Sequence, residues 1–301
     1  MKASTSILAL TALVLPQVAV AWDGFGHITV AYLASHFVSP TTEKYLKHVL
    51  GNNTEDYLGS VATWADSFRK TEEGAFSDTF HYIDALDDPP FWCGVDLERD
   101  CGETGCVVTA LANYTLQSLD PSLSLAQRHQ AAKFVIHFVG DLHQPLHNEN
   151  VEAGGNGIDV LFNGVEIDLH HVWDGSIGTL LVNDGVAGDP YVIAKKWSTQ
   201  LMVELTTGKY AEEKAGWLEG IDLKDPATTA LGWSRDCNSY ICTTVLPEGP
   251  TAIIGQELSG AYYEKAAPVV ELLVAKAGYR LAAWLDLIVD EYRRRKSCRM
   301  H

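Results

Sequence analysis

Residues 131–147 read AAKFVIHFVGDLHQPLH. The stretch is apolar over most of its length, which predicts a buried helix. His137 and Asp141 lie four residues apart in it, so both side chains project from one helical face. An imidazole and a carboxylate in apolar surroundings must be paired with each other or bound to a metal. Pro145 then ends the helix and brings His147 round to its C-terminal end.

A second His-x-x-x-Asp pair, His170 and Asp174, repeats this spacing further along the chain. His171 lies three residues before Asp174 and could also face it, so spacing alone does not choose between the two histidines. A single pair would be read most simply as a core histidine satisfied by an aspartate. Two pairs with His147 between them supply imidazole and carboxylate in the proportions that zinc accepts. The sequence therefore predicts a metal site.

Helical periodicity dominates the rest of the chain, and strand signal is scarce. Asn163-Gly164 is a favoured two-residue hairpin turn, and it joins segments 158–162 and 165–169. No linker, repeat or low-complexity tract divides residues 22–301, so we expect one domain. The sequence predicts a mainly α fold with one small hairpin and with helices at 28–38, 42–50, 107–119, 127–142, 191–206 and 268–292.

The first 21 residues predict a signal peptide. Lys2 is followed by an apolar stretch and by Ala19-Val20-Ala21, the small-x-small pattern that signal peptidase cleaves. Cleavage there would leave Trp22 at the N-terminus of a secreted chain, 22–301. No other apolar run approaches the roughly 18 to 20 residues of a membrane span. We therefore expect a secreted monomer that does not associate with membranes.

Composition and cysteine usage agree with an extracellular globular protein. The 301 residues have a net charge of −17 and are 47% hydrophobic, which excludes disordered, collagenous and coiled-coil chains. Six cysteines in an oxidising compartment indicate three disulfides, or two disulfides and free thiols. Spacing favours a local bridge between Cys101 and Cys106 and at least one long bridge from Cys93 to a downstream group, Cys237, Cys242 and Cys298.

Two further features are expected at the surface. Asn52 and Asn113 open N-glycosylation sequons, which in a secreted glycoprotein lie on exposed segments. The C-terminal tail, from about residue 287 to 301, contains the basic run 293–296. Such a run is most simply a solvated helix end that complements the helix dipole. Recruitment of nucleic acid is the alternative interpretation.

Short motifs rich in histidine and aspartate follow one another along the chain. They are Trp22 with His27, Trp64-Ala65-Asp66, His81-Tyr82-Ile83-Asp84, His137-x-x-x-Asp141, Gln144-Pro145-Leu146-His147, Gly154-Gly155-Asn156 and His170-x-x-x-Asp174. Together they resemble the fungal zinc-dependent single-strand-specific nuclease family, of the nuclease S-one and P-one type. The resemblance covers residues 22 to about 286. It implies the multi-helix fold that this family shares with zinc phospholipase C.

The resemblance implies three Zn²⁺ ions, of which two form a close pair. The residues that it assigns to the first ion of the pair are Asp66, His81, His137 and Asp141. Asp141 bridges to the second ion, which is also held by His27 and by the free α-amino group and carbonyl of Trp22. The third ion is assigned to His147, His170 and Asp174.

The activity implied by the resemblance is that of a secreted endonuclease. It would cleave single-stranded DNA and RNA to 5′-phosphorylated products and would also act as a 3′-nucleotidase. Zinc lowers the pKa of bound water to about 7, so a zinc-activated hydroxide would attack phosphorus. The catalytic residues implied are Asp66 and Arg69, and the Arg69 cation with the third zinc would stabilise the transition state.

Substrate choice is expected to depend on a base pocket. By resemblance, Tyr82 stacks on a base, Asp84 hydrogen-bonds the base edge, and Asn156 lines the same pocket. A base paired inside a duplex cannot reach such a ring, which implies a preference for single strands. Nucleic-acid proteins are usually basic, whereas this chain carries −17. We therefore expect contact with one or two nucleotides at the metals rather than along an extended groove.

The resemblance also pairs Cys93 with Cys242 and Cys101 with Cys106. Cys237 and Cys298 are additional and could form a third bridge that ties down the C-terminal tail. Two other functions remain open. A zinc-dependent phospholipase C would carry Glu at the final ligand position, where this chain has Asp174. A non-enzymatic secreted metal-binding glycoprotein would need the ligands without Arg69 or the stacking segment around Tyr82.

Overall fold

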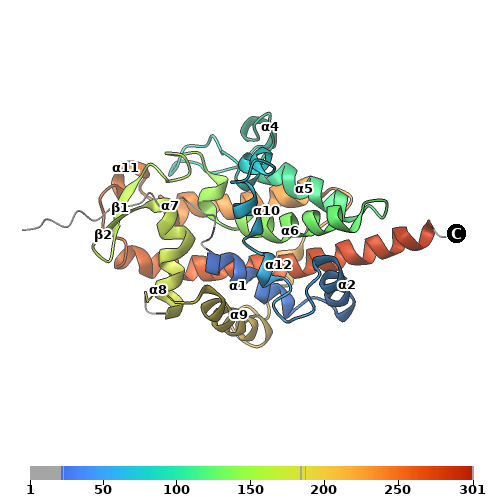
Figure 1. Ribbon diagram of the computed structural model, residues 1–301. Coiled ribbons are helices and arrows are strands. Elements are labelled where there is room, and N and C mark those ends of the chain that lie inside the picture. The colour runs from blue at the N-terminus through green and yellow to red at the C-terminus, as the bar shows by residue number, and fades with distance from the viewer. Residues whose placement is uncertain (1–21, 23, 184, 187, 300–301) are drawn as a thin grey trace, which may run out of the picture.

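One long helix forms the axis of the computed structural model, which describes residues 22, 24–183, 185–186 and 188–299 (Figure 1). This helix, α12 (Ala261–Cys298), runs along the molecule and contacts α1, α2, α5, α6 and α8. It buries Val270, Leu273, Leu281, Trp284 and Leu285 within a continuous apolar cluster. The predicted signal peptide, residues 1–21, lies outside the described residues.

The fold is mainly helical, as predicted. The longer helices beside α12 are α1 (Gly24–Ser35), α2 (Pro40–Leu50), α5 (Val107–Ser118), α6 (Leu125–Leu142), α9 (Pro190–Thr206) and α10 (Pro226–Tyr240). The shorter ones are α3 (Trp64–Phe68), α4 (Leu97–Asp100), α7 (Leu169–His171), α8 (Ile177–Asn183) and α11 (Pro250–Ile253). The 3₁₀ and π segments are η1 (Gly59–Val61), η2 (Ala75–His81), η3 (Pro145–Asn148), η4 (Val172–Ser176), η5 (Gly216–Leu218) and η6 (Ile241–Val245).

The predicted hairpin is confirmed. Strand β1 (Asp159–Phe162) pairs antiparallel with β2 (Val165–Asp168). Asn163 and Gly164 have φ of 53° and 73°, the left-handed conformation that this two-residue turn requires. Among the described residues no helix is both long and apolar enough to cross a membrane.

Helix ends differ from the predicted ones where a capping side chain precedes the apolar pattern. Ser39, Ser124 and Asp189 each accept a hydrogen bond from a first-turn amide, so α2, α6 and α9 begin directly after these caps. The sequence therefore placed three helix starts one or two residues too late.

The predicted start of the C-terminal helix at residue 268 is wrong by seven residues. Pro268 lies inside α12 at an exposed position, and the helix continues through it although proline cannot donate a helical hydrogen bond. The extra turns are anchored by Tyr262, whose hydroxyl accepts from Trp173 Nε1 at 2.7 Å and donates to the Val245 carbonyl at 3.0 Å. The helix also continues six residues beyond the predicted end at 292.

Helix α10 was not predicted, because polar residues interrupt the apolar residues of its buried face. Thr229, Ser234 and Asn238 are buried there beside Ala230 and Trp233. The usable signal was Asp225-Pro226, since the Asp225 carboxylate caps the Thr228 amide and proline occupies the first turn.

Two disulfides are present, Cys93–Cys242 and Cys101–Cys106, as the resemblance implied. The possible third disulfide, between Cys237 and Cys298, is not formed: Cys237 is a buried free thiol and Cys298 is an exposed free thiol. The neighbouring Asp236 bonds Lys276 at 3.0 Å, and Cys298 lies 22 residues beyond Lys276 on the same helix. That spacing corresponds to about 33 Å, whereas a disulfide needs Cα atoms within roughly 7 Å.

Candidate metal centre

The predicted ligands come from six short segments that meet around the C-terminal half of α6. They form three adjoining groups: His27, His137 and Asp141; Asp66, His81 and His137; and His147, His170 and Asp174. Every member of these groups is at most 7% exposed. The ligand atoms within each group lie within 4.8 Å of one another. Local helix spacing explains only two of the pairs, and tertiary folding brings in the rest.

Asp141 belongs to the first group and also contacts His81 of the second. Its Oδ2 atom is 3.1 Å from His81 Nδ1 and 3.3 Å from His137 Nε2, and its Oδ1 atom is 3.3 Å from His27 Nε2. Asp66 Oδ1 lies 3.6 Å from His137 Nε2. Burial raises the pKa of Asp141 and lowers the pKa of His81 and His137. A carboxylate among neutral imidazoles is the charge arrangement that a bound cation stabilises.

Backbone carbonyls select the tautomer of three histidines. The Nδ1 atoms of His137, His147 and His170 lie 2.7, 2.7 and 2.6 Å from the carbonyls of Ala62, His81 and Gly154. A carbonyl only accepts, so each Nδ1 carries the hydrogen, and each Nε2 lone pair is directed into the cluster. Metal-binding histidines are held in this way.

Several buried polar atoms of the cluster have no hydrogen-bond partner in the described part of the chain. They are both carboxylate oxygens of Asp66, Asp141 Oδ1, His147 Nε2 and Asp174 Oδ2. All are lone-pair acceptors, and acceptors can be satisfied together only by protons or cations. Nitrogen and carboxylate oxygen are donors that zinc accepts, so these residues fit the metal that the sequence predicts.

Of the two adjacent histidines, His170 belongs to the third group and His171 does not. His170 Nε2 lies 3.2 Å from Asp174 Oδ2, whereas His171 Nδ1 bonds Asp168 Oδ2 at 2.6 Å. Asp174 sits in the π segment η4, a local widening that often marks functional sites. Its Oδ1 accepts from Gln144 Nε2 at 2.6 Å, which orients the carboxylate.

Trp22 lies next to the cluster. Its buried indole donates from Nε1 to the Gly140 carbonyl at 2.9 Å, one residue before Asp141. This bond holds the predicted N-terminal residue against α6. The role of the Trp22 amine and carbonyl as ligands stays a prediction.

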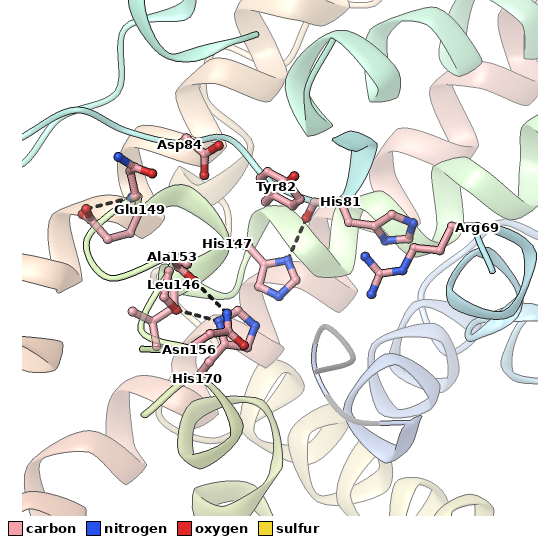
Figure 2. A pocket seen from close by; sticks show the side chains of 12 residues that line it. Arg69, His81, Tyr82, Asp84, Leu146, His147, Glu149, Ala153, Asn156 and His170 are labelled. Atoms are coloured by element: carbon pink, nitrogen blue, oxygen red, sulfur yellow. Dashed lines mark hydrogen bonds between the residues drawn. The ribbon is translucent and has the colours of Figure 1, made fainter. Parts of the chain in front are cut away.

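A pocket of about 340 Å³ opens over the second and third groups (Figure 2). Figure 2 shows Tyr82 and Asp84 on one side of His147 and Asn156 on the other. Arg69 also lines it, with Nη2 3.6 Å from Asp66 Oδ1 and Nη1 3.7 Å from Asp78 Oδ1. Burial raises the pKa of Asp84. The structure therefore places all four predicted substrate or transition-state residues in one pocket beside the cluster.

Sequence reasoning missed three contributors to the site. Gln144 was noted only as part of a motif, and Glu149, which lines the pocket, was not noted at all. Burial, with a smaller contribution from Asp87, raises the pKa of Glu149 to about 8. The third is Gly140, against which the ring of His27 packs. A glycine inside an apolar helix was the available signal, because it often marks a position where another segment packs closely.

His143, which lies close to these ligands in the sequence, is a core residue instead: its Nδ1 bonds the Val139 carbonyl at 2.7 Å and its Nε2 lies 3.0 Å from Arg280 Nη1. The two predicted glycosylation sites lie away from the cluster. Asn113 is exposed on α5, and Asn52 is partly exposed in the loop after α2. Use of the two sequons stays a prediction.

A helical scaffold with three adjoining His/Asp groups, two of which line one pocket, fits a metal-dependent enzyme. The profile of the S1/P1 Nuclease family matches residues 22–290. The chain is 47% identical to Nuclease S1 of Aspergillus oryzae over 94% of its own length and 97% of the relative. It is 41% identical to Nuclease P1 of Penicillium citrinum over 89% of its own length and 97% of the relative. It is 28% identical to Endonuclease 3 of Arabidopsis thaliana over 96% of its own length and 95% of the relative.

The chain belongs to the S1/P1 nuclease family, and it is a nuclease.

Proposed function

We propose that this nuclease is a secreted zinc enzyme that hydrolyses single-stranded DNA and RNA to 5′-phosphorylated products and acts on 3′-nucleotides. One observation carries the proposal. Three buried His/Asp groups adjoin one another, and two of them line a single pocket that contains a cation, an aromatic ring and a carboxylate. The relatives named nuclease and endonuclease match this chain over nearly its whole length.

Three ions would be held by the chain. The first set of residues is Asp66, His81, His137 and Asp141, the second Trp22, His27 and Asp141, and the third His147, His170 and Asp174. Bound zinc would supply Lewis-acid activation of water and would offset negative charge on a phosphoryl group. Asp141 joins the first two sets, because its two oxygens face histidines from both.

Arg69 is the cation available to a phosphate in the pocket. The pairs with Asp66 and Asp78 are 3.6 and 3.7 Å long, so they position the guanidinium without a short bidentate bond. A guanidinium fork matches the geometry of phosphate oxygens, so Arg69 would bind a phosphate that enters the pocket.

Tyr82 and Asp84 supply the recognition of a base. The Tyr82 ring is half-buried on the pocket wall, and every base can stack on such a face. Asp84 lies two residues further along the same extended segment and presents acceptors to a base edge. A base inside a duplex is already stacked and paired, so only an unpaired base can enter the pocket.

Secretion is part of the proposal and connects to the metal set. Removal of residues 1–21 would convert the Trp22 amide into a free amine beside α6. N-terminal sequencing of the exported protein tests this directly. A mature chain beginning at another residue would remove Trp22 from the ligand set.

The test of the proposed function is zinc analysis combined with cleavage assays on the signal-cleaved protein. We expect about three zinc ions per chain, faster cleavage of single-stranded than of duplex DNA, and 5′-phosphate ends. Chelation is expected to abolish cleavage, and added zinc to restore it. Zinc binding with turnover of phosphatidylcholine but not of nucleic acid would contradict the proposal.

A further inference from the structure

A basic groove lies away from the metal centre, at the opposite end of α6. Helix α2, the first turn of α6 and the last turns of α12 enclose about 680 Å³. In Figure 1 α2 lies close to the C-terminal part of α12, at one end of the molecule. The titratable side chains other than tyrosine that line it are Lys44, His48, Arg128, Arg293 and Lys296. No carboxylate is among the described lining residues, although the whole chain carries −17.

The basic run of the C-terminal tail is divided between two faces of α12. Arg294 and Arg295 both bond Glu291 at 2.7 Å, and Arg299 lies 3.7 Å from Asp120. These three cations are therefore engaged within the protein. Arg293 and Lys296, one turn apart, line the groove instead, and no ion pair to either is found in residues 24–183 or 188–299.

Complementing the dipole of α12 would explain cations at the end of that helix, but the groove also contains cations from two other helices. Lys44 and His48 project from α2, one turn apart, and are exposed. Arg128 comes from α6. Three helices thus direct positive charge into one concave surface, and like charges brought together in this way repel unless an anion is bound.

Arg128 forms a fixed floor for the groove. Its Nη1 donates to the hydroxyls of Tyr292 at 2.7 Å and Tyr45 at 3.4 Å, and its guanidinium lies 5.1 Å from the Tyr292 ring centroid. Its Nε atom is buried and has no hydrogen-bond partner in the described chain. A guanidinium held by two tyrosines is ordered before any ligand arrives, which reduces the entropy lost on binding.

The groove is distant from the pocket, and two of its cations lie beyond the part of the chain that the family profile matches. Arg128 precedes Asp141 by 13 residues on α6, which corresponds to about 20 Å along the helix. The family profile ends at residue 290, so Arg293 and Lys296 lie beyond it.

We propose that this groove binds the phosphate backbone of long single-stranded nucleic acid while the metal centre cleaves a segment about 20 Å away. The proposal rests on the proposed function and revises the expectation that contact is confined to the metals. Cationic side chains bind phosphates and release counterions. Tyr292 is only 4% exposed, so its ring cannot stack on a base, and binding is independent of sequence.

The test compares Arg293→Glu/Lys296→Glu with Lys224→Glu/Lys265→Glu, a control that makes the same charge change at exposed lysines elsewhere. For the groove variant at low salt we expect kcat/KM on long single-stranded DNA to fall about tenfold. The slope of log kcat/KM against the logarithm of the salt concentration should become shallower by about 1.4, because two phosphate contacts are lost. Cleavage of a dinucleotide should be unchanged in both variants, because it cannot span the two sites.

Binding is measured independently by the fluorescence anisotropy of a labelled phosphorothioate single strand, which resists cleavage. Equal losses in the groove and control variants, or no loss in either, would overturn the proposal. So would unchanged DNA binding combined with loss of binding to phosphatidylserine vesicles. Wild-type protein that binds the strand through the groove but cleaves neither substrate would contradict the proposed function and leave the groove standing.

Discussion

The ring of His27 fits against α6 only because residue 140 is glycine. A Cβ atom added there would lie 2.6 Å from His27 Nδ1 and 2.8 Å from Cε1. Contacts this short cannot be tolerated, and the ring is 1% exposed, so it has little room to move. The glycine thus places a ligand that lies more than 100 residues away in the chain.

Gly140→Ala is expected to displace His27, to lower the metal content and to reduce activity at least tenfold. The matched control is Gly232→Ala in α10, where nothing lies within 4 Å of an added Cβ. That change should leave activity intact and stabilise the protein by about 0.5 to 1 kcal/mol. Metal analysis and thermal unfolding of both variants check the contrast, and full metal content in Gly140→Ala would contradict it.

Adjacent histidines provide a second contrast at the residue scale. His170→Ala should lose one metal equivalent and about 100-fold or more in activity, since a metal supplies several kcal/mol of transition-state stabilisation. His171→Ala should keep both, because His171 bonds Asp168 instead of the cluster. Zinc content and steady-state rates measured in parallel decide the matter. Equal effects of the two substitutions would refute the assignment.

Tyr82 is expected to contribute through its ring rather than its hydroxyl. Stacking on a base is worth roughly 1 to 3 kcal/mol, so Tyr82→Ala should lower kcat/KM on single-stranded DNA by about 5- to 150-fold. Tyr82→Phe should stay within about twofold of the wild type, because it keeps the stacking face. Zinc content should not change in either variant. A large loss in Tyr82→Phe would show that the hydroxyl is required.

At the scale of elements, Asp236 connects α10 to α12 through two cations. Its carboxylate lies 3.0 Å from Lys276 Nζ and 2.8 Å from Arg280 Nη2. Arg280 also donates to the Trp217 carbonyl, and His143, the C-cap residue of α6, lies within bonding distance of Arg280. One buried guanidinium therefore joins three helices. Burial opposes ionisation of Asp236, but Arg280 and Lys276 outweigh it and lower its pKa.

Asp236→Asn should destabilise the protein by about 2 to 3 kcal/mol near neutral pH, because two nearly buried cations lose their carboxylate. A lowered folded-state pKa means that this stability is present above the unfolded value, about 4, and is lost as pH falls below it. The difference in unfolding free energy between wild type and variant should therefore shrink from pH 6 towards pH 3. Glu166→Gln, an exposed change of equal charge, should show no such trend. A difference that is constant with pH would argue against the ion pairs.

At the scale of the whole molecule, the two disulfides constrain very different lengths of chain. Cys93–Cys242 joins residues 149 apart, whereas Cys101–Cys106 joins residues five apart. In the chain-entropy description the first is worth at most about 5 kcal/mol and the second about 2. The long bridge ties the segment after the base-pocket residues to the end of α10.

Replacing both cysteines of a bridge with alanine should reveal this difference. The Cys93/Cys242 double variant is expected to lose more unfolding free energy in guanidinium than the Cys101/Cys106 variant. Both should keep their zinc, because neither bridge touches the cluster. A larger loss from the short bridge would mean that local strain or packing, not loop length, governs the effect.

The sequence by itself determined the helical class, the hairpin and the identity of the chemistry. These depend on local rules: period 3.6 for helices, Asn-Gly for the turn, and i,i+4 spacing for His137 with Asp141 and His170 with Asp174. The resemblance extended this to residues that are far apart, including Asp66 and His81. Helix α10 was not predicted because Thr229 and Ser234 interrupt the apolar residues of its buried face.

Tertiary structure decided what local spacing leaves open. It turned His170 to Asp174 and His171 to Asp168, because an Asp168 oxygen caps α7 and retains the second imidazole. It placed Cys237 in α10 far from Cys298 at the C-terminal end of α12, and it required glycine at position 140 through the approach of α1. It also divided the basic run 293–296, because Arg294 and Arg295 pair with Glu291 whereas Arg293 and Lys296 line the groove. For Gly140 the deciding partner, His27, lies on another helix, at a distance that only the packing of the helices sets.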